Sequence, residues 1–452
     1  AESIIGDDLT ERKHEVNFWG TNFLYKRKWF TRWKSELSVS HADYYMKNED
    51  KSNSVSIGEN NQINISNYLK NTEAKISLLY RFNRKGKLGI GYQFNAYQNY
   101  FNYNEQLSFE EDLFNELKAS ASSQGVFVKY HYSWKDKIDF QPQLRIDQVL
   151  GNKKWRINPV MSFHYKALPN LWIKTSYGQY FQLIRSLRQG ELQVSNVSES
   201  IWLLADGSLQ GGDEENLPNI LSRQFSIGAL FKKNAWLIDF DLFWKRTDNL
   251  SSINQFESNQ FFGFELGNAE TTGLELMLKK TFGRYQTWMS YSHSRVVNRF
   301  EGLSDLPFPS SYDRPHQFRW VHNLFLAPLE FSMGWILKSG SPYTIADKIS
   351  FGPNPNNPDG SESPELVYGP INGERLPMYH RLDFSVWYRF ENMAPAFSGQ
   401  IGFSVQNIYN RKNIWQRFYF VEDLDNNDNF EIIEEERYFL GFTPNLSVQL
   451  NF

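Results

Sequence analysis

The chain has 452 residues, a formal net charge of -3 and no cysteine. These values exclude disulfide bonds, cysteine-ligated zinc and thiol catalysis, and argue against nucleic-acid binding. No run approaches the roughly 18 consecutive apolar residues that a membrane helix needs. Aromatic residues nevertheless make up 17% of a polar chain. A membrane β-barrel fits this composition because its strands alternate apolar and polar side chains, and so does a large soluble β-protein.

Side chains alternate between apolar and polar with a period of two in segment after segment, which predicts β-strands. In chain order, the predicted strands are His14–Tyr25, Trp33–Met46, Gln62–Phe82, Lys87–Tyr103, Ala121–Trp134, Lys137–Val149, Trp155–Ala167, Leu171–Leu183, Leu221–Phe231, Ala235–Asp248, the two strands of a hairpin at Thr271–Val297, His316–Leu326, Leu329–Ser339, Met378–Phe390, Phe397–Tyr409 and Arg437–Phe452.

The hairpin at Thr271–Val297 displays the pattern most clearly. Its strands meet at Thr281–Arg284, a tight turn in which we expect Gly283 to take a positive φ. Its other end opens into the long polar stretch Asn298–Pro315. One end of the hairpin is therefore tight and the other is loose.

The same order of short turns and long loops holds along the chain, apart from the short connection Leu150–Lys154. We count roughly 17 strands of about 11–16 residues, longer than most strands of globular proteins. Short periplasmic turns and long extracellular loops are typical of outer-membrane barrels. The sequence thus predicts an all-β fold, a transmembrane antiparallel β-barrel. A soluble propeller or stacked sandwich is the alternative, with shorter strands and no such order.

The direction of the strands sets the expected domain organisation. If the last strand descends to the periplasm, an odd number of antiparallel strands makes the first one descend as well. We therefore expect residues 1–13 to be the tail of an outer loop and residues 14–452 to be the C-terminal part of a barrel. Further strands are then expected ahead of residue 1.

Several motifs resemble the C-terminal part of TonB-dependent outer-membrane receptors, in the form common in Bacteroidetes. Their order and spacing carry the resemblance more than any single motif does. They are Gly267–Leu276, Trp288–Ser294, Pro307–His316, Gly340–Thr344, His380–Phe384, Ser404–Asn410 and the terminal Leu446–Phe452 with its final aromatic residue.

The resemblance implies a barrel of about 22 strands around a plug, with neither the plug nor its TonB box in this chain. It implies TonB-dependent uptake of a scarce solute, such as a siderophore-chelated metal, and no enzymatic activity. Implied partners are outer-membrane lipid and lipopolysaccharide, and TonB acting through the plug. The alternative is a transporter-like barrel that serves as a structural scaffold for a surface lipoprotein or another outer-membrane subunit.

An acidic segment near the C-terminus has oxygen-bearing side chains at the spacing of a 12-residue calcium loop. Asp423, Asp425 and Asn427 match positions 1, 3 and 5, and Glu434 matches position 12. Position 6 is Asp428 instead of the glycine that the sharp turn needs, and helices are not expected beside it. A structural Ca²⁺ site is one hypothesis, and a solvated acidic loop is the other. No other cofactor is expected.

The long outer loops contain five candidates for ligand contact, chosen because binding residues often lie on loops. They are Arg185, Arg188, Trp202, Tyr343 and Tyr368. No catalytic residue is predicted. Ser292–Ser294 cannot form a serine–histidine pair locally, because neighbours on a strand face opposite sides.

Overall fold

The structure is a computed structural model made of β-strands, loops and turns. It describes residues 2–5, 8–54, 59–83, 85–106, 113–150, 155–187, 201–205, 208–210, 218–254, 263–353, 362–394, 397–423 and 429–451. These residues form 28 strands. Across the described ranges there is no helix long and apolar enough to cross a membrane.

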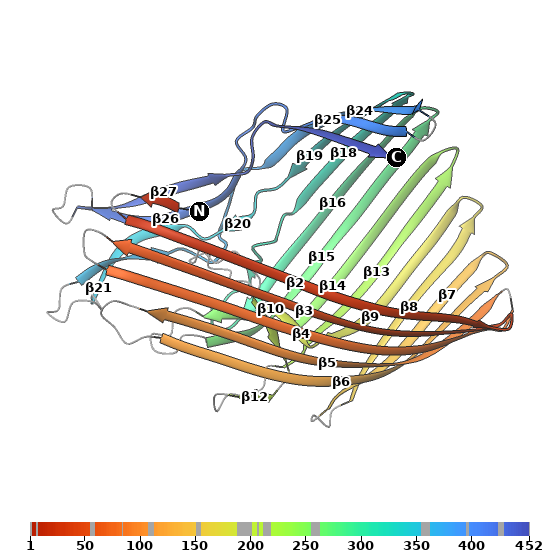
Figure 1. The fold of residues 1–452 in the computed structure, drawn as a ribbon, viewed down its shortest axis with the longest axis horizontal. Helices are drawn as coiled ribbons and strands as arrows, with labels where there is room; N and C mark the ends of the chain where they lie inside the picture. The colour runs from red at the N-terminus through yellow and green to blue at the C-terminus, as the bar shows by residue number, and fades with distance from the viewer. Residues whose placement is uncertain are drawn as a thin grey trace.

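One antiparallel sheet of 20 strands dominates the fold and curves round into a barrel wall (Figure 1). Three of its strands are only two to four residues long, which leaves 17 long ones, as the sequence predicts. In spatial order the long strands are β2 (Asp8–Trp29), β3 (Trp33–Ser54), β4 (Glu59–Arg81), β5 (Gly86–Gln106), β6 (Leu113–Trp134), β7 (Ile138–Val149), β8 (Trp155–Leu168), β9 (Leu171–Gln182), β13 (Ile220–Lys233), β14 (Trp236–Asn254), β15 (Gly263–Phe282), β16 (Tyr285–Phe300), β18 (His316–Leu326), β19 (Leu329–Lys338), β24 (Tyr379–Ala394), β25 (Phe397–Gln406) and β28 (Thr443–Asn451).

The remaining strands are not among these 17 and lie in or beside the long connections. They are β1 (Glu2–Ile5), β10 (Ile184–Leu187), β11 (Ile201–Leu204), β12 (Ser208–Gln210), β17 (Phe308–Pro309), β20 (Pro342–Tyr343), β21 (Ala346–Pro353), β22 (Glu362–Tyr368), β23 (Glu374–Arg375), β26 (Ile414–Asp423) and β27 (Phe430–Tyr438). We refer to the end of the wall with these connections as the outer end, and to the opposite end as the short-turn end. The two ends are separated along the length of the strands (Figure 1).

Strand boundaries agree best with the prediction at the short-turn end. At the outer end the strands run further than predicted: β2 begins at Asp8 rather than at His14, and residues 2–5 pair with it as β1. The last predicted strand, Arg437–Phe452, is wrong as a single element. Its start belongs to β27, which pairs with β26, and only Thr443–Asn451 joins the wall.

The outward face of the wall is apolar and exposed. The register places Ile90 beside Val128, and Val128 beside Leu144, on adjacent strands. These three side chains are 46%, 41% and 43% exposed. A continuous belt of this kind faces lipid in a membrane barrel, so the pattern that predicts strands also sets the membrane-facing surface.

The inward face carries hydrogen-bonded polar side chains. Arg145 donates to the side-chain oxygen of Gln93 at 2.7 Å, and Gln93 donates to Glu73 at 2.7 Å. Asp147, which is buried, accepts from Arg145 at 2.7 Å and from Asn158 at 2.8 Å. Burial of these groups is tolerated because each has a partner.

The wall has two edges among the described residues. β2 pairs with β1 and β3, and β28 pairs with β25, while no pairing joins β2 to β28. The termini lie close to these edges (Figure 1). Unpaired strand edges present free backbone donors and acceptors that readily pair with further strands.

The tight turns use residues that tolerate positive φ. Phe282 and Tyr285 close the β15–β16 ladder around Gly283 and Arg284, and Gly283 has φ 56°, as predicted. In the β13–β14 turn, Asn234 and Ala235 have φ 49° and 63°. Positive φ in a two-residue turn matches the right-handed twist of the strands that it joins.

Replacing Gly283 by valine tests this turn. A Cβ at Gly283 would have no neighbour within 4 Å, so the cost comes from the backbone conformation alone. We expect Gly283→Val to lower the free energy of unfolding by about 1–2 kcal/mol, measured by urea titration in detergent. Gly283→Asn is the control and is expected to lose less, because asparagine tolerates positive φ. Equal losses in the two variants would contradict this account.

Candidate functional site

The candidate site lies at the outer end, where four separate two-stranded sheets rise from the wall. They pair β10 with β11, β20 with β23, β21 with β22, and β26 with β27. The last two pack together, since the rings of Phe351 and Phe430 lie 5.8 Å apart. The predicted contact residues that the structure describes lie on three of these sheets: Arg185 and Trp202 on β10–β11, Tyr343 on β20 and Tyr368 on β22.

The β10–β11 hairpin is attached to the inner side of the wall through the backbone of Trp202. The Asn67 side chain accepts from the Trp202 N–H at 2.7 Å and donates to its carbonyl oxygen at 2.9 Å. Asn99 donates to the same carbonyl at 2.8 Å. The Trp202 ring is half-buried and meets Tyr44 edge-on, with centroids 6.4 Å apart. Its backbone is therefore fixed while its ring borders the interior.

Arg185 holds the other strand of this hairpin. Its side chain is buried and donates to the hydroxyl of Ser251 and to the carbonyl of Pro218. The hairpin thus bridges β4 and β5 on one side and β14 on the other. The geometry favours a structural role for Arg185. Arg188 lies outside the described residues.

An ion pair between the buried Asp313 and the partly exposed Arg375 connects the β16–β18 and β19–β24 connections. The Asp313 carboxylate pairs with Arg375 and accepts from the Val296 N–H at 2.6 Å. Arg375 also donates to the Asp313 carbonyl at 2.8 Å. Since Arg375 pairs with Pro342 in the β20–β23 ladder, the wall positions that ladder through Asp313.

Tyr343, on β20, is part of a polar cluster with the β26–β27 hairpin. Arg417 donates to the Tyr343 hydroxyl at 3.1 Å and to Glu436 at 2.8 Å. It also forms an ion pair with Glu434 at 3.2 Å. Tyr343 is buried, so it positions Arg417 and is not open to a ligand in this conformation.

Two tyrosines near this cluster have perturbed acidity. Burial, together with Tyr343 and Glu434, raises the pKa of the Tyr419 hydroxyl. Tyr419 therefore stays protonated and donates to Glu434 at 3.2 Å. Burial also raises the pKa of Tyr368, which ends β22 opposite Ala346. Tyr368 is half-buried, so it and Trp202 are the predicted contact residues with rings partly accessible.

Of the acidic segment, the structure describes Asp423, which ends β26, and residues 429–434, most of which lie in β27. Asp423 pairs with Phe430, whereas Glu434 pairs with Tyr419, four residues further along the strand. That separation is about 13 Å along the hairpin, and Glu434 is engaged by Arg417. Asp425 and Asn427 lie outside the described residues, so the calcium loop stays a prediction. Within the described ranges, no group of three or more His, Asp or Glu side chains could hold a metal ion.

Asn67, Asn99, Asp313, Arg375 and Arg417 are the residues that the sequence reasoning missed. Asp313 stands inside the motif Pro307–His316, which carries the family resemblance, and could have been singled out there. The others are separated from their partners by long stretches of sequence, up to the 135 residues between Asn67 and Trp202. No local pattern indicates such a contact.

The comparisons with known proteins agree with this architecture. A family model described as "TonB dependent receptor-like, beta-barrel" matches residues 5–408. No curated protein matches significantly. Among solved structures, the chain is similar to the ferric yersiniabactin uptake receptor FyuA from Yersinia pestis, with 12% identity and a TM-score of 0.63 over 99% of this chain and 62% of that one.

Two further structures extend the comparison. The ferric preacinetobactin receptor BauA from Acinetobacter baumannii has 12% identity and a TM-score of 0.58, over 98% of this chain and 64% of that one. The copper transporter OprC has 11% identity and a TM-score of 0.61, over 99% of this chain and 69% of that one. The chain spans less than two thirds of the length of FyuA and BauA. At identities of 11–12%, this structural similarity shows a shared fold and nothing more.

Asn67→Ala tests the anchor of the β10–β11 hairpin. The change removes three hydrogen bonds, two of them to Trp202, so we expect the local opening free energy to fall by about 2–4 kcal/mol. The readout is hydrogen exchange, with the Trp202 amide exchanging at least about thirtyfold faster. Asn17→Ala, at an exposed side chain that bonds Glu15, is the control. Unchanged exchange at Trp202 would refute the anchor.

Asp313→Asn tests the clamp between the two connections. The variant keeps the size of the side chain but loses the ion pair to Arg375, whose side chain remains 36% exposed. We expect a loss of about 1–3 kcal/mol, reduced from the value for a fully buried pair by solvent screening. Faster proteolysis between β19 and β24 is the readout. Asp248→Asn, in the more exposed pair with Arg246, should leave proteolysis nearly unchanged.

Proposed function

We propose an uptake function from one premise: this chain belongs to the TonB-dependent receptor family of outer-membrane β-barrels. It lies in the outer membrane of a Gram-negative bacterium. The family comprises receptors and transporters rather than enzymes. Our proposal is that the chain takes part in TonB-dependent uptake of a small, metal-chelating solute.

The observation that carries the proposal is the family match, which runs from residue 5 to residue 408. Proteins named as uptake receptors for ferric yersiniabactin and ferric preacinetobactin, and as a copper transporter, share the fold over nearly all of this chain. All three names concern metals or metal chelates. Chelated metal is therefore the solute class with the most support.

The geometry of the outer end is suited to capture. Polar anchors hold two of its four two-stranded sheets to the wall: Asn67 holds β10–β11, and Asp313 holds β20–β23. The half-buried rings of Trp202 and Tyr368 supply apolar contact area for a chelate. We propose that TonB, pulling from the inner membrane, supplies the energy for release into the periplasm.

Whole-cell uptake of a ferric chelate tests the function. In the native host under iron limitation, we expect radioactive iron uptake to fall to background when the protein is deleted or when TonB is removed. Trp202→Ala should raise the half-saturation concentration about tenfold, the equivalent of one lost aromatic contact of about 1.4 kcal/mol. Trp155→Ala, at an exposed tryptophan on the outward face, should leave uptake unchanged.

The proposal would be contradicted by a deletion strain that accumulates iron, copper and other metal chelates at the same rate as the wild type. Outer-membrane levels of each variant, measured by immunoblot, ensure that a lost signal reflects binding and not lost protein.

A further inference from the structure

A large cavity lies on the inner face of the wall, away from the hairpins of the outer end. Its volume is about 1080 Å³, and its lining comes from β2 to β8, toward the short-turn end. Small-molecule sites typically occupy about 300–1,000 Å³. This cavity therefore has the size of a solute site.

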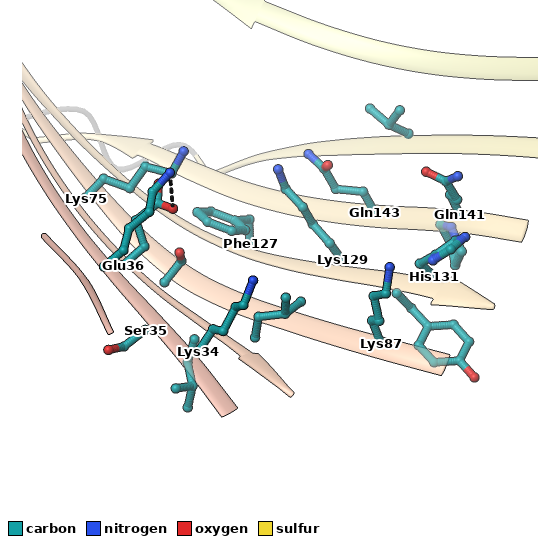
Figure 2. A pocket seen from close by; sticks show the side chains of 18 of the residues that line it. Lys34, Ser35, Glu36, Lys75, Lys87, Phe127, Lys129, His131, Gln141 and Gln143 are labelled. Atoms are coloured by element: carbon teal, nitrogen blue, oxygen red, sulfur yellow. Dashed lines mark ion pairs between the residues drawn. The ribbon is translucent and has the colours of Figure 1, made fainter. Parts of the chain in front are cut away.

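The charged lining of the cavity is almost entirely positive. Lys34, Lys75, Lys87 and Lys129 line it together with the basic residues Lys26–Lys28 near the end of β2. Figure 2 shows the side chains of Lys34, Lys87 and Lys129 extending from neighbouring strands to one side of the sheet. Lysines crowded on a concave, partly dehydrated wall repel one another and raise the local positive potential.

Carboxylates do not neutralise this charge within the described ranges. Glu36 is the lining carboxylate, and it pairs with Lys26 at 3.4 Å. Asp139 lies nearby but is held by His131 and Gln141, each at 2.6 Å. In the part of the chain that the structure describes, Lys34, Lys75, Lys87 and Lys129 form no ion pair with a carboxylate.

Two of these lysines share one aromatic ring. The ammonium groups of Lys75 and Lys129 lie 5.6 Å and 5.0 Å from the centroid of Phe127, which is buried. A Cβ at Gly91 would overlap the Phe127 ring, so glycine at that position makes room for it. The ring supports both cations, because its face attracts positive charge, and holds them on the same side of the wall.

The neutral side chains of the lining can also donate hydrogen bonds. Gln141 and Gln143 come from β7, Ser77 from β4 and Ser162 from β8. Ammonium, amide and hydroxyl donors on one concave surface match the acceptor oxygens of carboxylates and phosphates. They do not match an apolar or a cationic ligand.

From this arrangement we infer that the inner wall between β3 and β8 is a binding site for a solute that carries several carboxylate or phosphate groups. The inference rests on the proposed uptake function for how the solute reaches the interior. The site would select negatively charged solutes after they pass the outer hairpins. Lys75 and Lys129 are the central binding residues, held in place by Phe127.

Calorimetry on the full-length protein, purified from outer membranes in detergent, tests the site. The probes are citrate and pyrophosphate, with maltose as a neutral comparison. We expect both anions to bind, to bind more weakly as salt is added, and maltose not to bind. The tighter of the two anions identifies carboxylate or phosphate as the preferred group.

Variants locate the binding. Lys75→Gln combined with Lys129→Gln should raise the Kd of the tighter anion at least about tenfold, and Lys129→Arg should keep it within about twofold. Lys232→Gln combined with Lys233→Gln, at the exposed β13–β14 turn, is the matched control. Heat-modifiable migration on gels shows that each variant is folded.

Three outcomes would overturn the site. The Lys75 and Lys129 double variant could bind the anion as tightly as the wild type, or maltose could bind equally well. Alternatively, neither anion binds and both lysines resist amine acetylation in mass spectrometry, which would mean that an acidic polypeptide fills the cavity. Ferric-chelate uptake separates the two proposals. Anion binding without TonB-dependent uptake would contradict the proposed function, and uptake without anion binding would contradict the proposed site.

Discussion

Everything in this structure depends on the backbone ladder of the wall. In hydrocarbon there is no water to satisfy an N–H or C=O group, so each strand must pair along its length. Pairing fixes the register, and the register fixes which side chains face lipid. A slip by one residue would replace Ile90 and Val128 on the outward face by Gly91 and Lys129. The alternation of apolar and polar residues in the sequence therefore allows only one register of the sheet.

The outer end follows a different rule, because it is surrounded by water and need not pair every backbone group. Its sheets have two strands each, and single side chains anchor two of them, β10–β11 and β20–β23. Asn67 replaces a missing strand by bonding both backbone groups of Trp202. The Asp313 carboxylate accepts from the Val296 N–H and also pairs with Arg375. Such point anchors fix position without a continuous ladder, which leaves the loops between them free to vary in length.

This difference explains what could be predicted from the sequence. The strands His316–Leu326 and Leu329–Lys338 were predicted to within a residue because the membrane enforces alternation there. Gly283 was predicted because a two-residue turn has few solutions. The β26–β27 hairpin was missed because the acidic run Phe430–Tyr438 lacks a period-two alternation, and the hairpin packs on β21–β22 and Tyr343 and not in the wall.

The site was harder to predict for the same physical reason. Arg185 and Tyr343 were chosen by their location in loops, and both are buried with partners. Arg417 supplies the positive charge of its cluster, but its partners Tyr343 and Glu436 lie 74 and 19 residues away in the sequence. Long-range polar contacts are decided by tertiary structure and leave no periodic pattern in the sequence. Candidate residues could therefore be chosen only by the loop in which they lie.

The distribution of charge along the inner wall is the last consequence of the ladder. On the β9–β14 side, Lys174 lies 2.6 Å from both Asp239 and Asp241, so its charge is more than balanced. On the β3–β8 side, Lys75 and Lys129 have an aromatic ring for a neighbour instead of a carboxylate. All three lysines occupy inward positions of the same sheet, so alternation alone does not explain the difference. One side of the interior is neutralised within the chain, whereas the other keeps a positive surface whose natural complement is an anion.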